Sequence, residues 1–327
     1  MFRNKLLPSL LLSLLAPALA EAKVNVRKLY QFPNDVFHGI EKFAIRPNGH
    51  LLLNTIMEPV VYTLDPRAAT PTATPLHQFD GATGLAGITE VSSHVFAMVV
   101  GNYSVHELKG ISGSLGIWKL DLTSGIPVVS KITSIPEGQT LNGMTTASDN
   151  VVLVVDSPIG IVYSVKINTG AYQVAILHGN VESQTLKLSH HPAPHFLSAS
   201  TASTGQTELC TSPTLAPNTF GKVPISAQGT AARSPSIIAT APANNFYADF
   251  TLDGGGNPWI TLHPHALDIV RLSSGIDSIA LNSTEVVHPS ACIFGNSRDT
   301  KGTVYVVTAG GETESQIISG QVFAFTV

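Results

Sequence analysis

The chain has 327 residues, of which 43% are hydrophobic and 12% are charged, and its formal net charge is −4. This length suits one large β domain or two ordinary ones. The charge pattern argues against a nucleic-acid partner, because such a protein needs a basic stripe and this sequence has none. Ser, Thr, Gly and Pro are frequent instead, which is typical of secreted all-β proteins.

Residues 1–20 have the pattern of a secretory signal peptide. Arg3 and Lys5 form a short positive region, an apolar run follows, and small residues end at Ala20. An uncleaved membrane anchor fits less well, because the apolar run is short and is interrupted by prolines. We therefore expect a mature domain of residues 21–327 that is secreted or lies in a vesicle lumen, with no further membrane span.

The expected secretory location gives two cysteines and two sequons a predicted role. Cys210 and Cys292 would lie in an oxidising compartment, which favours one disulfide between them over two buried free thiols. Asn102 and Asn282 each begin an Asn-X-Ser/Thr sequon and are predicted glycosylation sites. Asn282 lies in a polar stretch between strands, whereas Asn102 could instead point its amide into a pocket.

Short β-rich runs separated by turn residues repeat along the chain. The clearest copy runs from 141 to 170, where the strands Val151–Val155 and Ile161–Val165 flank a turn that contains Asp156 and Pro158. Further strands are expected at Val24–Phe32, His50–Thr55, Val60–Leu64, Gly87–Val91, Val95–Val100, Gly116–Leu122, Tyr247–Leu252, Trp259–Leu262, Ala266–Leu272, Ala291–Phe294, Val304–Thr308 and Val322–Val327.

The repeat has a period that predicts the fold. First-strand positions fall at Phe43, Ile88, Met144, Phe250 and Ala291, which are 45, 56, 106 and 41 residues apart. The longest interval leaves room for one degenerate copy near 186–188, with a Ser/Thr/Pro-rich excursion over 198–236. Repeats of this length with about four short strands each are typical of propeller blades.

The fold class is therefore all-β, a six-bladed β-propeller of four-stranded antiparallel blades. A pair of β-sandwiches would not explain why similar turns recur at this period. The N-terminal strand Val24–Phe32 is expected to pair with the C-terminal strand Val322–Val327 and so to close the ring.

Five stretches carry a family resemblance: Glu41–Leu53, Gly101–Leu122, Leu141–Gly170, Ala248–Trp259 and Gly302–Gly311. In these the chain resembles the fungal branch of the gluconolactonase-like, or regucalcin-like, six-bladed propellers. The resemblance spans nearly all of the mature chain and implies the fold. It does not fix an activity, because propellers host many chemistries.

Lactonases of that family hold one divalent cation with a Glu, an Asn and an Asp at the pore. By resemblance Glu41 matches the first ligand and Asn142 matches the second. With Asp253 and Trp259 held in register, the Asp position falls on Ala248 and Asp249 is shifted by one residue. A one-residue shift on a strand turns a side chain to the opposite face, so the ligand set is expected to be incomplete.

The signal peptide, the sequons and the broken ligand set resemble a different group with this fold, the secreted fungal hetero-Diels–Alderases of tropolone–sesquiterpenoid biosynthesis. That resemblance implies a secondary-metabolism enzyme that joins a quinone methide, from a tropolone or phenol, to a humulene-type alkene. The reaction needs no metal or other cofactor. It needs small apolar substrates held in a dry pocket, with a donor to the oxygen that gains electron density.

The candidate catalytic residues are Glu41, Asn142, Asp156, His263 and His265. Either histidine of the His-Pro-His sequence could protonate a leaving hydroxyl or donate to a quinone-methide oxygen. The plainer alternative is a turn with solvated histidines, and for Asn142 and Asp156 it is turn capping. A metal-dependent lactonase, a non-catalytic binding propeller and a structural protein remain alternatives to the cycloaddition enzyme.

Overall fold

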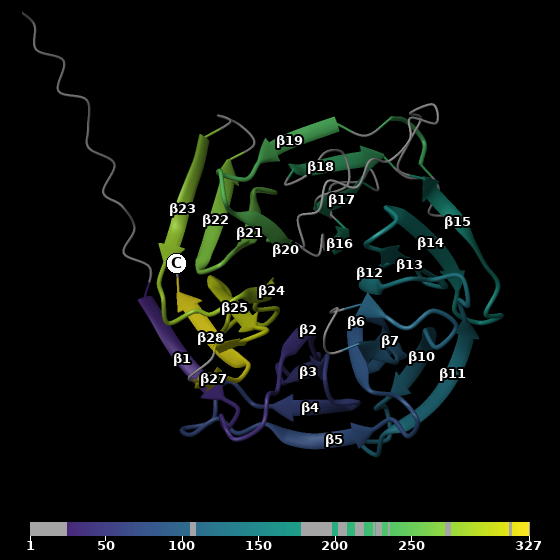
Figure 1. Ribbon diagram of the computed structural model, residues 1–327, viewed down its shortest axis with the longest axis horizontal. Coiled ribbons are helices and arrows are strands. Elements are labelled where there is room, and N and C mark those ends of the chain that lie inside the picture. Colours follow the sequence, from purple (N-terminus) through teal and green to yellow (C-terminus); the bar gives the residue numbers. More distant parts are fainter. Residues whose placement is uncertain are drawn as a thin grey trace, which may run out of the picture.

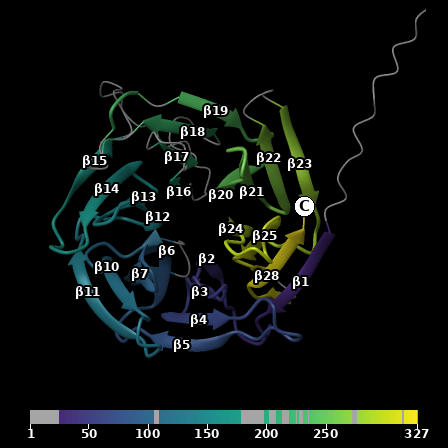
Figure 2. The ribbon, with the colours of Figure 1, turned by 180° about the vertical axis from the view of Figure 1, so that it is seen from behind.

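Figure 1 shows the computed structural model, which describes residues 25–326 except for 105–108, 178–197, 202–207, 213–218, 225, 227–230, 235, 272–275 and 314–315. The described residues form antiparallel β-sheets that are arranged around a central axis as a β-propeller (Figures 1 and 2). Among these residues, no helix has the length and hydrophobicity needed to cross a membrane.

The strands of the described residues form six four-stranded antiparallel sheets and two short ribbons. The first three sheets contain β2 (Ile40–Ile45), β3 (Leu51–Thr55), β4 (Val60–Leu64) and β5 (Thr74–Gln78); β6 (Gly84–Ser92), β7 (Val95–Gly101), β10 (Gly116–Asp121) and β11 (Val128–Ser134); and β12 (Leu141–Ser148), β13 (Val151–Asp156), β14 (Ile161–Lys166) and β15 (Tyr172–Leu177). The ribbons are β8 (Tyr103–Ser104) with β9 (Lys109–Gly110), and β26 (Gly311–Thr313) with β27 (Gln316–Ile318).

The other three sheets contain β16 (Ser198–Thr201), β17 (Glu208–Ser212), β18 (Thr219–Pro224) and β19 (Ser236–Thr240); β20 (Phe246–Leu252), β21 (Pro258–His263), β22 (Ala266–Arg271) and β23 (Ile276–Asn282); and β24 (Pro289–Phe294), β25 (Thr303–Thr308), β28 (Gln321–Thr326) and β1 (Asn25–Gln31). The strands β2, β6, β12, β16, β20 and β24 lie nearest the centre in Figure 1, and the fourth strand of each sheet lies at the rim.

The two ends of the described chain meet in one sheet. Strand β1 runs antiparallel to β28, with Asn25 opposite Thr326 and Gln31 opposite Gln321. The predicted pairing of the N-terminal and C-terminal strands is confirmed. It makes the last sheet a composite of residues from both ends of the sequence.

The core lies between neighbouring sheets, and strand β3 shows why its sequence is hydrophobic throughout. Leu53 packs with Val307 of β25 on one side, and Leu52 packs with Leu85 of β6 on the other. Both leucines are fully buried. Alternate residues of a strand point to opposite faces, and here both faces are covered. Each such leucine contributes roughly 1.5–3 kcal/mol of burial energy.

The fourth repeat differs from the sequence-based expectation. Its four strands occupy residues 198–240, the stretch that was expected to be an excursion, while the expected copy near 186–188 lies outside the described residues. Serine and threonine dominate β16, and threonine fits a pleated strand without giving a hydrophobic pattern. The rim strands β5 and β11 were missed for a related reason, since they are mostly exposed or half-buried and do not alternate.

The predicted disulfide between Cys210 and Cys292 is wrong. Cys292 is a free thiol on β24, 1% exposed, and its Sγ donates a hydrogen bond to the carbonyl oxygen of Trp259 at 3.2 Å. Cys210 lies on β17, and the sheet that begins with β20 separates the two strands (Figure 1). Burial also raises the pKa of the Cys292 thiol, which keeps it protonated.

The sequons lie in different environments, and the predicted signal peptide lies outside the described residues. Asn282 is exposed at the end of β23, as a glycan requires. Asn102 is half-buried between β7 and β8, and its Oδ1 is buried without a hydrogen-bond partner in the described structure. Glycosylation at Asn102 and Asn282 stays a prediction, and Asn282 is the more accessible position.

Candidate functional site

Five central strands carry a bulge at the same position. Among the described strands, the pairing register shifts on β2, β6, β12, β20 and β24, each time next to the strand start. The shifted segments contain Glu41, Ala86-Gly87, Asn142-Gly143, Ala248-Asp249 and Ser290. A bulge inserts residues into one strand and re-aims its side chains. The repeated bulges thus turn polar groups toward the axis of the ring.

Small residues in these bulges allow the central strands to approach one another. A Cβ added to Gly87 would lie 2.2 Å from the carbonyl oxygen of Asn142, which is too close for any side chain. The neighbouring Ala86 carbonyl accepts a hydrogen bond from Asn54 Nδ2 at 2.7 Å. The backbone of β6 is therefore held against β3 and β12, and this contact fixes the position of Asn142.

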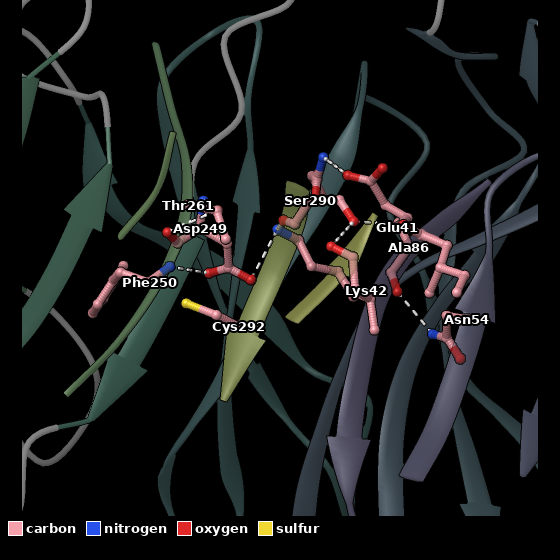
Figure 3. A network of polar contacts seen from close by, with 12 residues as sticks. Glu41, Lys42, Asn54, Ala86, Asp249, Phe250, Thr261, Ser290 and Cys292 are labelled. Atoms are coloured by element: carbon pink, nitrogen blue, oxygen red, sulfur yellow. Dashed lines mark hydrogen bonds and ion pairs between the residues drawn. The ribbon is translucent and has the colours of Figure 1, made fainter. Parts of the chain in front are cut away.

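Lys42 and Asp249 form a buried ion pair near the axis (Figure 3). The Lys42 Nζ donates to Asp249 Oδ2 at 3.1 Å and to the carbonyl oxygen of Ser290 at 3.3 Å. Lys42 is 5% exposed and Asp249 is 8% exposed. Each charge would be costly to bury alone, so each stabilises the other.

The bulge on β20 overturns the expectation that Asp249 faces away from the centre. Tyr247 and Phe250 pair with Leu262 and Ile260, so the two residues between them lie opposite one residue of β21, Thr261. The Thr261 hydroxyl accepts from the Asp249 amide at 2.8 Å, and Asp249 Oδ1 accepts from the Phe250 amide at 2.7 Å. Strand alternation, on which the expectation rested, does not hold across a bulge.

Glu41 and Asn142, which the resemblance places at one pore, are in contact although they lie 101 residues apart. Asn142 Nδ2 donates to Glu41 Oε1 at 2.9 Å, and both residues are buried. Burial raises the pKa of the Glu41 carboxyl, against the lowering effects of Lys42 and of the Asn142 hydrogen bond. The Asn142 Oδ1 is buried and has no hydrogen-bond partner among the described residues.

Asp156 caps a turn, which was the alternative to a catalytic role. It is fully buried at the end of β13, and its two carboxylate oxygens accept from the amides of Gln139 at 2.8 Å and Thr140 at 2.9 Å. Burial raises its pKa, although both hydrogen bonds act in the opposite direction. Its contacts are with the backbone between two sheets and not with the Lys42 pair.

His263 and His265 are brought together by a third histidine that the sequence reading missed. The His288 ring lies between them, with ring centroids 5.2 Å from His263 and 6.4 Å from His265, and the planes are nearly parallel. The Nδ1 of His265 donates to the Val286 carbonyl at 3.1 Å. The Nδ1 of His288 donates to the carbonyl of Gly310 at 2.8 Å. The only signal in the sequence was a His-Pro dipeptide at 263–264 and 288–289, which also occurs at 191–192 and is therefore weak.

Burial lowers the pKa of His263 to about 3, with His288 as the next cause, so this ring stays neutral at physiological pH. Stacked rings do not aim their nitrogens at a common point. In keeping with this, the part of the chain that the structure describes contains no group of three or more His, Cys, Asp or Glu side chains that could hold a metal ion.

A cavity of about 270 Å³ has Lys42 and Asp249 among its lining residues. Its apolar lining consists of Phe43, Ile88, Met144, Phe250, Ile293 and Phe294, with Ala44 and Ile45, and Cys292 also lines it. Glu90 and Asn296 are among the other polar lining residues. None of the five predicted catalytic residues is among the lining residues, whereas Lys42 and Asp249 are.

The residues near Lys42 do not fit the divalent cation that the gluconolactonase-like resemblance implies. The Lys42 ammonium already donates to the Asp249 carboxylate. The Glu41 carboxylate accepts from the Asn142 NH2 group, so the Asn142 oxygen does not point to the same place as the Glu41 oxygens. A divalent cation prefers several free oxygen donors. We therefore derive no chemistry through a metal at this site.

Comparison with solved structures finds other propellers. A calcium-binding regucalcin from Agrobacterium tumefaciens is 13% identical, with a TM-score of 0.66 over 93% of this chain and 94% of that one. A luciferin-regenerating enzyme is 12% identical, with a TM-score of 0.62 over 93% and 95%. Streptogramin B lyase is 13% identical, with a TM-score of 0.56 over 94% and 99%. At these identities the similarity shows the fold alone. No family model and no curated protein matches the chain.

Proposed function

We propose that this protein is an enzyme that binds a small, largely apolar organic molecule in the central cavity and polarises one oxygen of it with Lys42. One observation carries the proposal: a buried ammonium lies in the wall of a cavity that apolar and polar residues line together. Such a donor is already oriented, since Asp249 and the Ser290 carbonyl hold it. A fixed donor in a dry site stabilises developing negative charge more than water does.

The reaction that we propose is a metal-independent hetero-Diels–Alder addition. The oxygen and the methylene carbon of a quinone methide, from a tropolone or phenol, form a C–O and a C–C bond with an alkene of humulene type. No group leaves and no redox partner is needed. Electron density grows on the oxygen as the ring becomes aromatic, and a hydrogen bond from Lys42 lowers the barrier to that change.

The cavity volume bears on how two partners are placed. Typical ligand pockets measure roughly 300–1,000 Å³, so a cavity of about 270 Å³ is small. We assign the oxygen-bearing ring to the cavity, beside Lys42, and the alkene to its open side. Holding the two partners in one orientation would supply a large part of the rate acceleration.

Lactone hydrolysis is the second candidate. Two observations favour it. Glu41, Asn142 and Asp249 lie near the axis of the propeller, and the fold is similar to that of regucalcin. The Lys42 ammonium argues against it, because it occupies the carboxylate that a cation would need. A non-catalytic binding protein would use the same cavity without turnover.

Two further proposals concern the whole chain. We propose that the sheets act as six blades of one ring, which the pairing of β1 with β28 closes. We also propose that the chain enters the secretory pathway and carries glycans at Asn102 and Asn282. Mass spectrometry of the protein made in a secreting host would locate both the mature N-terminus and the glycans.

A product assay tests the proposed activity. The purified protein is incubated with humulene and a hydroxymethyl-phenol or hydroxymethyl-tropolone precursor, which loses one water molecule to give the quinone methide before the addition. The adducts are separated on a chiral column. The proposal predicts one enantiomer in excess and a rate above that of heat-denatured protein. Lys42→Met should lose this rate, while the matched variant Lys119→Met on β10 should keep it. EDTA-sensitive hydrolysis of lactones with no adduct would support the second candidate instead.

A further inference from the structure

We infer that the Lys42 ammonium is a built-in substitute for a divalent cation, and that removing it would open a cation site at the centre of the ring. This inference goes beyond the proposed reaction, because it concerns whether Lys42 or a metal ion balances the negative charge of Asp249 and Glu41. It follows from the set of oxygen atoms around Lys42, from the charges they carry and from one acceptor that has no partner.

The oxygen atoms come from four of the bulged strands, β2, β12, β20 and β24. Figure 3 shows those of Glu41, Asp249 and Ser290. Asp249 Oδ2 and the Ser290 carbonyl accept directly from Lys42, at 3.1 and 3.3 Å. Glu41 is the next residue along the chain from Lys42, and its carboxylate accepts from the amide of Asn142. Carboxylate, carbonyl and amide oxygens are the ligands that calcium prefers.

Asn142 supplies the second, independent observation. It is 1% exposed, and within the part of the chain that the structure describes its Oδ1 has no hydrogen-bond partner, whereas its Nδ2 donates to Glu41. A buried acceptor without a donor is costly. Rotating the Asn142 amide by 180° about its Cβ–Cγ bond would bring this oxygen beside the Glu41 carboxylate. A cation could then bind oxygens of both side chains.

Charge balance explains why the wild-type protein does not need a metal. Asp249 is ion-paired with Lys42, and the buried Glu41 carboxyl lies within electrostatic reach of both charges. Without Lys42 the centre would hold two buried carboxylates with no counter-ion. A divalent cation of small radius would then be the most favourable occupant.

Thermal melting tests the inference without any substrate. Wild-type protein and the variants Lys42→Ala and Lys42→Gln are melted in EDTA and in Ca²⁺ or Mn²⁺. We expect no cation response from the wild type and a rise in Tm of about 5 °C for Lys42→Ala at about one hundred times the Kd. Lys42→Gln keeps a donor for Asp249 and adds an oxygen, so it should fold in EDTA and show a rise as well.

The double variant Lys42→Ala/Asp249→Asn is the control, because it lacks one carboxylate and should lose the response. An EDTA-sensitive Tm of the wild type would overturn the inference, since a metal would then already be present. It would also be overturned if Lys42→Gln folds and neither variant responds to Ca²⁺ or Mn²⁺. Since no substrate is used, failure here is distinct from failure of the cycloaddition assay.

Discussion

Lys42 donates a hydrogen bond to Asp249 at 3.1 Å, although 207 residues separate the two along the chain. Lys42 lies on β2 and Asp249 lies on β20, two central strands of different sheets. A bulge on each strand makes the contact possible. The pair thus depends on the correct assembly of the propeller, and it places a positive charge in the wall of the central cavity.

Breaking this pair from one side should be strongly destabilising. Lys42→Met leaves the Asp249 carboxylate buried without a counter-charge, and we expect the free energy of unfolding to fall by about 3–5 kcal/mol. The double variant Lys42→Met/Asp249→Leu removes both charges and should recover most of that loss. Urea unfolding of the three proteins measures the difference. Equal stability of the single and double variants would contradict this description of the pair.

Thr261 should position Asp249 through its hydroxyl, which accepts from the Asp249 amide and donates to its carbonyl at 3.1 Å. Thr261→Val keeps the shape but leaves both buried groups unpaired, and we expect a loss of about 1–3 kcal/mol. Thr63→Val on β4 is the matched control, because the Thr63 hydroxyl is buried without a partner. It should cost less than Thr261→Val; an equal cost would refute the positioning role.

Acid should destabilise the protein through His263. Its pKa falls from 6.5 to about 3 on folding, with burial, His288, Lys42 and His265 all lowering it and a backbone hydrogen bond at Pro289 raising it. Below pH 6.5 the unfolded chain therefore binds a proton that the folded chain does not. The free energy of unfolding falls as the pH drops from about 6.5 toward 3, by at most about 1.4 kcal/mol per pH unit.

Glu41 acts in the opposite direction, because its pKa is raised in the folded protein and its protonation above pH 4.5 favours folding. His263→Asn isolates the histidine contribution, since it removes the titrating ring next to Phe246. Urea unfolding at a series of pH values should show a shallower acid loss for this variant. His77→Asn, on the rim strand β5, should keep the wild-type slope. Identical slopes for His263→Asn and wild type would contradict the assignment.

The Cys292 thiol should be unreactive in the folded protein. It is 1% exposed and burial raises its pKa, so a thiol reagent meets neither an accessible sulfur nor a thiolate. After unfolding without reductant the thiol should react at once. If unfolded protein releases no colour from a thiol-specific reagent until a reductant is added, Cys292 is in a disulfide after all.

The sequence predicted the inner strands well because both of their faces are buried. Strand β4 was placed at its observed bounds, and β13 within one residue, since continuous Val, Leu and Tyr runs between turn residues are a strong signal. Rim strands such as β5 carry no such signal, because only part of their surface is covered. Strand β16 of the fourth sheet was hidden because its serines and threonine give no hydrophobic pattern.

The candidate site was only partly accessible from the sequence. The resemblance of two motifs placed Glu41 and Asn142 at one pore, and the structure brings their side chains into contact. The role of Lys42 could not be inferred, because it depends on a bulge in β20 that redirects Asp249, and a bulge leaves no reliable mark in a single sequence. His288 was also missed, since only the folded ring brings it between His263 and His265.

Binding of an unreactive ligand tests the central claim, that Lys42 polarises a substrate oxygen inside the central cavity, most directly. Isothermal titration of tropolone into the wild type, Lys42→Met/Asp249→Leu and the Lys119→Met control measures this without turnover. We expect the double variant to bind about 10–100-fold more weakly, since a hydrogen bond to a charged donor is worth about 1.5–3 kcal/mol. Equal affinity of all three folded proteins, or no binding to the wild type, would contradict the claim.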